Sequence, residues 1–187
     1  MISKIFNNAL QVHSQLTEDL NLHKIVEEIS STCITALKNG KKIIFCGNGG
    51  SFADAQHITA EFVGRFIKER QSLAAITLGC NPSSTTAVGN DYSFDDIFSR
   101  ELSAIGQEGD VFIGITTSGN SSNILNAMDV ALTKGLHTFG FTGNKKGAIT
   151  QKCTCVEVPS NSTPRIQECH ILIGHIICEM VDNALSS

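Results

Sequence analysis

The stretch KIIFCGNGGS, Lys42–Ser51, joins a short apolar run to a turn that contains three glycines. An apolar run rich in β-branched side chains predicts a strand covered on both faces, as in a parallel sheet. After Ser51 the apolar residues return to helical spacing as far as about residue 67. A strand, a glycine-rich turn and a helix in this order predict one βα unit of an α/β protein.

The same pattern recurs along the chain. Further apolar runs occupy residues 73–77, 111–116, 137–142 and 154–158, and helical stretches are predicted at 52–67, 93–103, 122–134 and 145–151. Because strands alternate with helices, we expect a parallel sheet with right-handed crossovers. Ligands of such sheets bind outside the carboxyl ends of the strands. A site is therefore expected among the segments that follow them: 47–51, 78–91, 116–121, 142–144 and 159–165.

Helical regions flank the predicted sheet. Residues 2–38 carry apolar side chains at helical spacing, with a break expected near Thr17 or Asn21 and a stop at Asn39-Gly40. A last helix, at about 164–185, is apolar round much of its surface, so we expect it to be largely buried. The 187 residues are predicted to form a single domain (1–187), in which a helical arm (1–40) joins an α/β core (41–187).

Composition excludes several classes of protein. The net charge is −4 and the basic residues are scattered, which disfavours a nucleic-acid surface. No stretch approaches the ~18 apolar residues of a membrane span, and the N-terminus lacks the apolar region of a signal peptide. We therefore expect a cytoplasmic protein with no membrane partner.

The seven cysteines lack the spacing of a disulfide framework. Cys46 and Cys178 lie in apolar runs and are expected in the core. Cys153 and Cys155 are predicted to point to the same face of a strand. A zinc site there is an alternative, but no second pair of ligands follows at finger spacing, so reduced thiols are the preferred interpretation.

Two segments after strands have the composition of ligand loops. The glycines before Ser51 allow close approach to a ligand, and Ser51 is a suitable N-cap for the next helix. The segment Thr116–Ser122 offers five hydroxyls and a glycine before a helix N-terminus, which predicts a phosphate cradle. It contains no lysine, which favours a phosphate that is held rather than transferred.

Histidines and a glutamate supply candidates for proton transfer or metal binding. His57, Glu61 and Arg65 are spaced four residues apart, so a helix would present them on one face. Arg65 is expected simply to pair with Glu61. In the last helix, which Thr163 is predicted to cap with Pro164 at its first position, His175 is expected to be buried and His170 to lie on the opposite face.

Four motifs together resemble a known family. They are Gly47–Ser51, Ala53–His57, Thr117–Ser121 and Thr163–Glu168, and they are similar to those of the bacterial phosphoheptose isomerases, within the SIS (sugar isomerase) superfamily. The resemblance covers nearly the whole chain, and four motifs in order at matching spacing make it specific. It implies a flavodoxin-like three-layer α/β/α sandwich with a five-stranded sheet, assembled as a homotetramer.

The resemblance also implies an activity and a set of residues. The activity is conversion of D-sedoheptulose 7-phosphate to D-glycero-D-manno-heptose 7-phosphate, for lipopolysaccharide or another surface glycan. The phosphate would be held by Thr116, Thr117, Ser118 and Ser121. The sugar would be lined by Asn48, Gly49, Gly50, Ser51, His57, Glu61, Asn90, Asp91 and Gln167. Glu61 and His175 match the catalytic acid–base pair, and His57, Glu61, Gln167 and His175 match the ligands of one zinc ion per subunit.

Such an isomerisation moves a proton between adjacent carbons through an enediol. Glu61 suits the base, and His175 suits the group that moves the proton on oxygen. Gln167 and His175 are eight residues apart, roughly 12 Å along an ideal helix. We therefore expect either a helix start that bends inward or ligands drawn from two subunits.

Two other functions are compatible with the fold. One is a non-enzymatic SIS adaptor, like the bacterial paralogue that binds the replication initiator protein. The other is a module that senses sugar phosphates, which needs the Thr116–Ser121 loop but no base. Neither requires Glu61 and His175 together, so the isomerase is the preferred interpretation.

Overall fold

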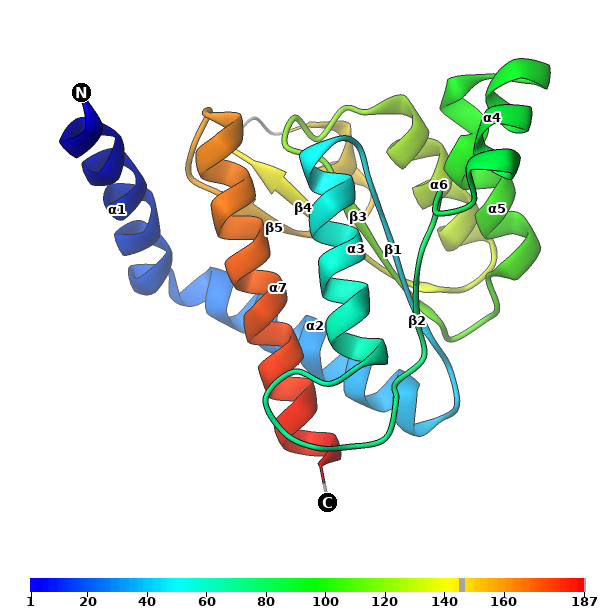
Figure 1. Ribbon diagram of the computed structural model, residues 1–187, viewed down its shortest axis with the longest axis horizontal. Coiled ribbons are helices and arrows are strands. Elements are labelled where there is room, and N and C mark those ends of the chain that lie inside the picture. The colour runs from blue at the N-terminus through cyan, green and yellow to red at the C-terminus, as the bar shows by residue number, and fades with distance from the viewer. Residues whose placement is uncertain (145–146, 187) are drawn as a thin grey trace.

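The computed structural model describes residues 1–144 and 147–186. Its strands are β1 (Ile43–Gly47), β2 (Ala75–Thr77), β3 (Val111–Ile115), β4 (His137–Gly143) and β5 (Thr154–Val158). Its helices are α1 (Ile2–Glu18), α2 (Leu20–Lys38), α3 (Gly50–Val63), α4 (Pro82–Asp91), α5 (Ile97–Ile105), α6 (Ser122–Thr133) and α7 (Thr163–Leu185), with short 3-10 turns η1 (Phe94–Asp96) and η2 (Ala148–Gln151). Figure 1 shows the helices on both sides of the sheet.

The sheet is parallel throughout, with strand order β2-β1-β3-β4-β5. This is the flavodoxin-like order, and it confirms the predicted α/β fold. The chain runs outward from β1 to β2 and then returns to the other side of β1. The point of reversal lies between β1 and β3, where folds of this type bind their ligands. The loops after these two strands are therefore the ones placed for function.

Two apolar cores lie on opposite faces of the sheet. Side chains alternate along β1, so that Ile43 and Phe45 join one core while Ile44 and Cys46 join the other. The first core is completed by α2, α3 and α7, and the second by α5 and α6. The three-layer sandwich follows from this alternation. Cys46 and Cys178 are both buried, as predicted.

Several predicted boundaries are wrong. The segment 78–91 contains helix α4, which the sequence signals through Asn81, whose side chain caps it, and through Pro82 in its first turn. The helix expected at 145–151 is only the short turn η2, and residues 145–146 lie outside the described part of the chain. β5 is not apolar throughout, because it lies at the sheet edge and exposes Glu157.

The N-terminal arm packs along α7. The break between α1 and α2 falls at Asp19, whose carboxylate accepts hydrogen bonds from the amides of Asn21 and Leu22. α1 leaves large apolar side chains exposed, and α7 is less buried than predicted, since Leu172 and Ile176 are about 40% exposed. Within residues 1–144 and 147–186, no helix is long and apolar enough to cross a membrane.

Candidate active site

The glycine-rich turn after β1 leads directly into α3. The helix begins at Gly50 with Gly49 as its N-cap, so the prediction that Ser51 is the cap is wrong by two positions. Ser51 is buried in the first turn, and its amide donates to the carbonyl oxygen of Asn48 at 3.0 Å. The turn therefore presents Asn48 and the exposed backbone at Gly49 and Gly50 at the sheet's carboxyl edge.

The loop after β3 is ordered by its own hydroxyl groups. The Oγ1 atom of Thr116 lies 2.9 Å from Oγ of Ser121 and 3.4 Å from Oγ of Ser118. Gly119 has φ = 70°, a conformation that other residues rarely adopt, and so closes the loop in front of α6. Ser121 is the N-cap of α6. Hydroxyls gathered at a helix N-terminus are suited to binding an anion, which is the role that the composition predicts for this loop.

A reciprocal pair of amides joins the two loops. Asn48 Nδ2 donates to Oδ1 of Asn123, and Asn123 Nδ2 donates to Oδ1 of Asn48, both at 2.9 Å. Asn123 is buried in the first turn of α6. The pair spans the reversal point of the sheet and fixes the Gly47–Ser51 turn relative to the Thr116–Ser121 loop. Sequence analysis missed Asn123, although an amide side chain directly after the Thr116–Ser122 segment is visible in the sequence.

Three side chains from α3 and α7 converge on one point. His57 Nε2 lies 2.9 Å from His175 Nε2 and 3.3 Å from a carboxylate oxygen of Glu61. One ligand atom from each of the three residues lies within 4.8 Å of the others, an arrangement that suits a metal ion. His57 is the most exposed of the three, and the group therefore faces solvent.

Close packing of the two helices produces this convergence. α3 and α7 run side by side in the same direction (Figure 1). Gly174 lies against Ile58, so closely that a Cβ atom at residue 174 would stand 2.4 Å from Cδ1 of Ile58. The small residue lets the helices approach, and the adjoining positions His175 and His57 then meet. These three residues come from one chain, so this group forms without a ligand from a second subunit.

Gln167 lies two turns away from this group. Its side-chain amide covers Gly50, where an added Cβ would stand 2.5 Å from Nε2 of Gln167. The side chain therefore borders the glycine turn, on the same face of α7 as His175. α7 has Ser162 as its N-cap, one residue before the predicted Thr163.

Other predictions for these helices need correction. His170 is fully buried against the sheet and His175 is only half-buried, the reverse of the expectation. α7 carries apolar residues on both faces, so its periodicity does not reveal which face the sheet covers. Arg65 lies beyond the end of α3 and pairs with Glu69 at 3.8 Å rather than with Glu61.

Asp54 and the end of α4 complete the surroundings. Asp54 lies one turn before His57, and burial raises the pKa of its carboxyl to about 6 while His57 partly lowers it. Sequence analysis missed it, although its spacing from His57 places both on one helix face. Asn90 and Asp91 are exposed, and Asn90 Nδ2 donates to Asp91 at 2.8 Å. Within residues 1–144 and 147–186, no hydrogen bond joins them to either loop.

Buried charges anchor the end of α3. Asp182 accepts hydrogen bonds from the amides of Ile67 and Lys68 and from Arg70 Nε, at 2.5–3.0 Å. Arg70 in turn donates to the carbonyl oxygens of Glu61 and Phe62. These hydrogen bonds hold the segment after α3 against α7, close to Glu61.

Comparison with known proteins agrees with this geometry. Residues 6–143 match the model of the SIS domain family. The chain is 53% identical to the phosphoheptose isomerase of a Nitratiruptor species over 89% of each chain. The structure of the phosphoheptose isomerase of Neisseria gonorrhoeae matches with a TM-score of 0.90 and 36% identity over 97% of each chain. That of a Francisella tularensis phosphoheptose isomerase matches with a TM-score of 0.92 and 34% identity, over 97% of this chain and 96% of that one. This chain therefore belongs to the phosphoheptose isomerase family of SIS-domain proteins.

Proposed function

We propose that this chain isomerises D-sedoheptulose 7-phosphate to D-glycero-D-manno-heptose 7-phosphate. The observation that carries the proposal is the meeting of His57, Glu61 and His175 beside a turn that is tied to a hydroxyl-rich loop. The loop supplies a place for the phosphate, and the group on α3 and α7 supplies acid–base side chains. The names and coverage of the relatives support the same activity.

The phosphate is held by the hydroxyls of Thr116, Thr117, Ser118 and Ser121 in this proposal. Thr117 and Ser118 also line a small hollow with Ser160, Asn161 and Thr163, which gives the bound group a second wall. The amide pair of Asn48 and Asn123 holds the sugar-side turn at a constant distance from the phosphate. Gly49, Gly50, Ser51 and Gln167 border the chain of the sugar, and Asn90 and Asp91 are proposed to reach it from α4.

Proton transfer is assigned to Glu61 and His175. Glu61 removes a proton from the carbon beside the carbonyl and returns it to the neighbouring carbon, through an enediol. His175 moves the proton between the two oxygens, because its Nε2 atom faces the centre of the group. His57 lies between the two and fixes their separation. Each role needs a side chain that is half-open to substrate, as these are.

A divalent ion, proposed to be zinc, fits this donor set. Two imidazole nitrogens and a carboxylate oxygen are ordinary zinc ligands, and they leave a position open for substrate. Gln167 is proposed as a further ligand from the same face of α7. When bound, such an ion polarises a carbonyl oxygen and stabilises negative charge on it. Glu61 used as a ligand is a weaker base, so the two roles of Glu61 compete.

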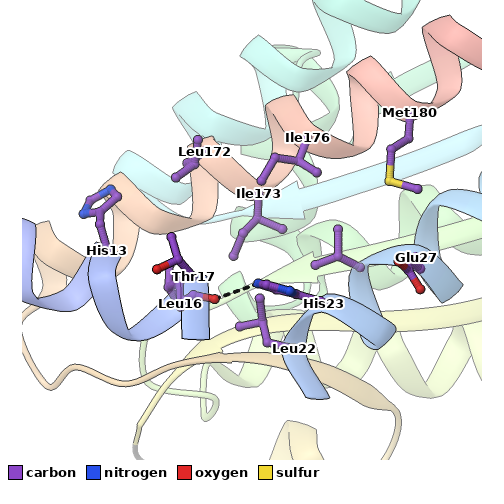
Figure 2. Close-up of a pocket in the computed structure, with 11 residues that line it drawn as sticks. His13, Leu16, Thr17, Leu22, His23, Glu27, Leu172, Ile173, Ile176 and Met180 are labelled. Carbon is purple, nitrogen blue, oxygen red and sulfur yellow. Dashed lines mark hydrogen bonds between the residues drawn. The ribbon is translucent and has the colours of Figure 1, made fainter. Parts of the chain in front are cut away.

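A homotetramer is proposed from the exposed apolar surface of the arm. Ile2, Ile5, Phe6 and Leu10 are between 48% and 71% exposed on α1. Figure 2 shows that a groove between the two arm helices and α7 is lined by Leu16, Leu22, Leu172, Ile173, Ile176 and Met180. Apolar surface of this extent on one side is typical of a subunit interface. We also propose a cytoplasmic location and a role in heptose synthesis for a surface glycan. The seven free cysteines support the cytoplasmic location.

The adaptor alternative is not supported, since the relatives described above carry isomerase names. The sensing alternative has the same phosphate loop but requires no acid–base group. Turnover separates it from the isomerase.

The test is turnover of sedoheptulose 7-phosphate with and without a chelator. Wild type should convert the substrate, and Glu61→Gln should lose at least about 100-fold in kcat, as expected when a general base is removed. Glu69→Gln is the matched control, because the Glu69 side chain is 89% exposed in the segment after the same helix, so its loss should leave turnover unchanged. Absence of turnover in wild type under every metal condition would contradict the proposal. Loss on chelation with recovery on added zinc would support the metal.

A further inference from the structure

Cys153 and Cys155 form a dithiol at the edge of the sheet. Cys153 lies just before β5 and Cys155 lies within it, and their Sγ atoms are 3.7 Å apart. Cys155 is buried in the second core, whereas Cys153 is partly open to solvent. Of the other cysteines, only Cys80 is exposed. The pair is therefore reachable from solvent on one side and held in the core on the other.

The two sulfur atoms lie close enough for a small movement to bring them to bonding distance. A disulfide requires Cα atoms no more than about 6.8 Å apart, and residues two apart in extended backbone are separated by about that distance. The chain bends at Cys153, outside the regular strand. Closing the sulfur atoms from 3.7 Å to a bond of about 2.05 Å needs a movement of about 1.7 Å.

That movement has to come from Cys153. The sulfur of Cys155 lies against Gly140, since a Cβ at residue 140 would stand 2.7 Å from it. β5 is held by its backbone ladder to β4. Cys153 has no ladder partner, and its amide donates to the carbonyl oxygen of Ile149 at 3.2 Å. A shift of Cys153 therefore acts on the η2 turn.

The η2 turn is bonded to the phosphate loop. The Ile149 amide donates to the carbonyl oxygen of Gly119 at 3.0 Å, and the Ala148 amide donates to Oδ1 of Asn120 at 2.9 Å. Gly147 packs directly on Gly119. These contacts brace the same glycine that closes the Thr116–Ser121 loop. A continuous set of hydrogen bonds thus joins the dithiol to the proposed phosphate site.

We propose that Cys153 and Cys155 are a reversible oxidation site, closed by low-molecular-weight disulfides, and that closure weakens phosphate binding at the Thr116–Ser121 loop. The second half of this inference rests on the proposed function, because it takes that loop as the phosphate site. The first half does not depend on it.

The oxidation proceeds by two thiol–disulfide exchanges. The hydrogen bond between the sulfurs lowers the pKa of Cys155 and raises that of Cys153. When the pair loses one proton to solvent, the two sulfur atoms share the proton that remains. The Cys153 sulfur, passing its proton to Cys155, attacks the reagent disulfide, forms a mixed disulfide and releases one thiolate. Cys155 gives its proton to that thiolate, attacks the Cys153 sulfur and releases a second thiolate, which takes a proton from water. Two protein thiols are oxidised and one reagent disulfide is reduced to two thiols.

The experiment uses the full chain with Cys80→Ser, which removes the exposed lone thiol. Protein is incubated with oxidised glutathione, alkylated, and analysed by intact mass and peptide mapping. The expected product lacks two hydrogens, carries no glutathione, and links residues 153 and 155. Titration with inorganic phosphate by calorimetry should then show affinity about fivefold weaker than in the reduced protein, the lower range of ordinary coupling between sites. Reduction by dithiothreitol should restore it.

Cys80→Ser with Cys153→Ser is the matched control, and its phosphate affinity should not respond to the oxidant. A glutathione adduct that persists on Cys153, or two thiols that remain free to alkylate, would overturn the disulfide. A disulfide that forms without any change in phosphate affinity would overturn the coupling. If the reduced protein binds no phosphate, the phosphate site and the coupling both fail, while the mass measurement still decides the oxidation site.

Discussion

Removal of the Asp182 carboxylate should be among the most destabilising single changes in this chain. Asp182 and Arg70 have side chains only 1% and 2% exposed, and the carboxylate accepts from Arg70 Nε at 2.5 Å and from two backbone amides. Burial alone would raise the pKa of Asp182, but these hydrogen bonds hold it below its usual value, so the pair is ionised at pH 7. Asp182→Ala leaves the guanidinium buried without a counter-charge.

The magnitude follows from that uncompensated charge. Breaking a buried ion pair from one side costs about 3–5 kcal/mol. With a urea m-value of about 2 kcal/mol/M, the unfolding midpoint should fall by about 2 M. Asp129→Ala is the matched control, because the pair of Asp129 with Lys152 is partly exposed and should be worth at most about 1 kcal/mol. Both variants are unfolded in urea at one protein concentration, since assembly shifts apparent stability.

A double substitution tests the cause. Arg70→Met with Asp182→Leu removes both charges, so it should cost less than the sum of the single changes. The variants should also reduce kcat in the folded protein, because Arg70 donates to the carbonyl oxygen of Glu61 at 2.8 Å. The reasoning would be refuted if Asp182→Ala lowered the free energy of unfolding by less than about 1 kcal/mol, or if the effects of the two single substitutions simply added in the double variant.

Three further predictions concern separate features. Burial lowers the pKa of His170 to about 4, so on acidification the unfolded chain binds this proton before the folded chain does. The free energy of unfolding should therefore fall by about 3 kcal/mol as the pH drops from 6.5 to 4. His170→Gln should flatten that part of a pH series of urea midpoints, and an unchanged slope would contradict the assignment to His170. Gly50→Ala should displace the amide of Gln167 and lower kcat at least about tenfold, with an unaltered melting temperature, and full activity would exclude a role for this contact. Asn48→Ala and Asn123→Ala should each lower the free energy of unfolding by about 1–3 kcal/mol and show a coupling energy in a double-mutant cycle. Independent effects of the two substitutions in urea unfolding would argue against the Asn48–Asn123 amide pair.

Part of the fold and of the site was predictable from local pattern. The strands β1 and β3 are continuous apolar runs because helices cover both of their faces, and such runs are visible in any sequence. Their order with the helices implies a parallel sheet, and glycine and hydroxyl residues after β1 and β3 mark its ligand edge. The spacing of His57 and Glu61 places them together on α3 without reference to the rest of the chain.

Contacts between distant segments were decided by packing alone. His175 lies 118 residues from His57, and it reaches that residue because Gly174 lets α7 approach Ile58. Asn123 meets Asn48 because β1 and β3 are neighbours in the sheet, which follows from the topology rather than from either residue. Of the two histidines on α7, the sheet buries His170 and leaves His175 for the site. Periodicity cannot distinguish them, because burial depends on which elements pack against each face, and only the assembled layers determine that.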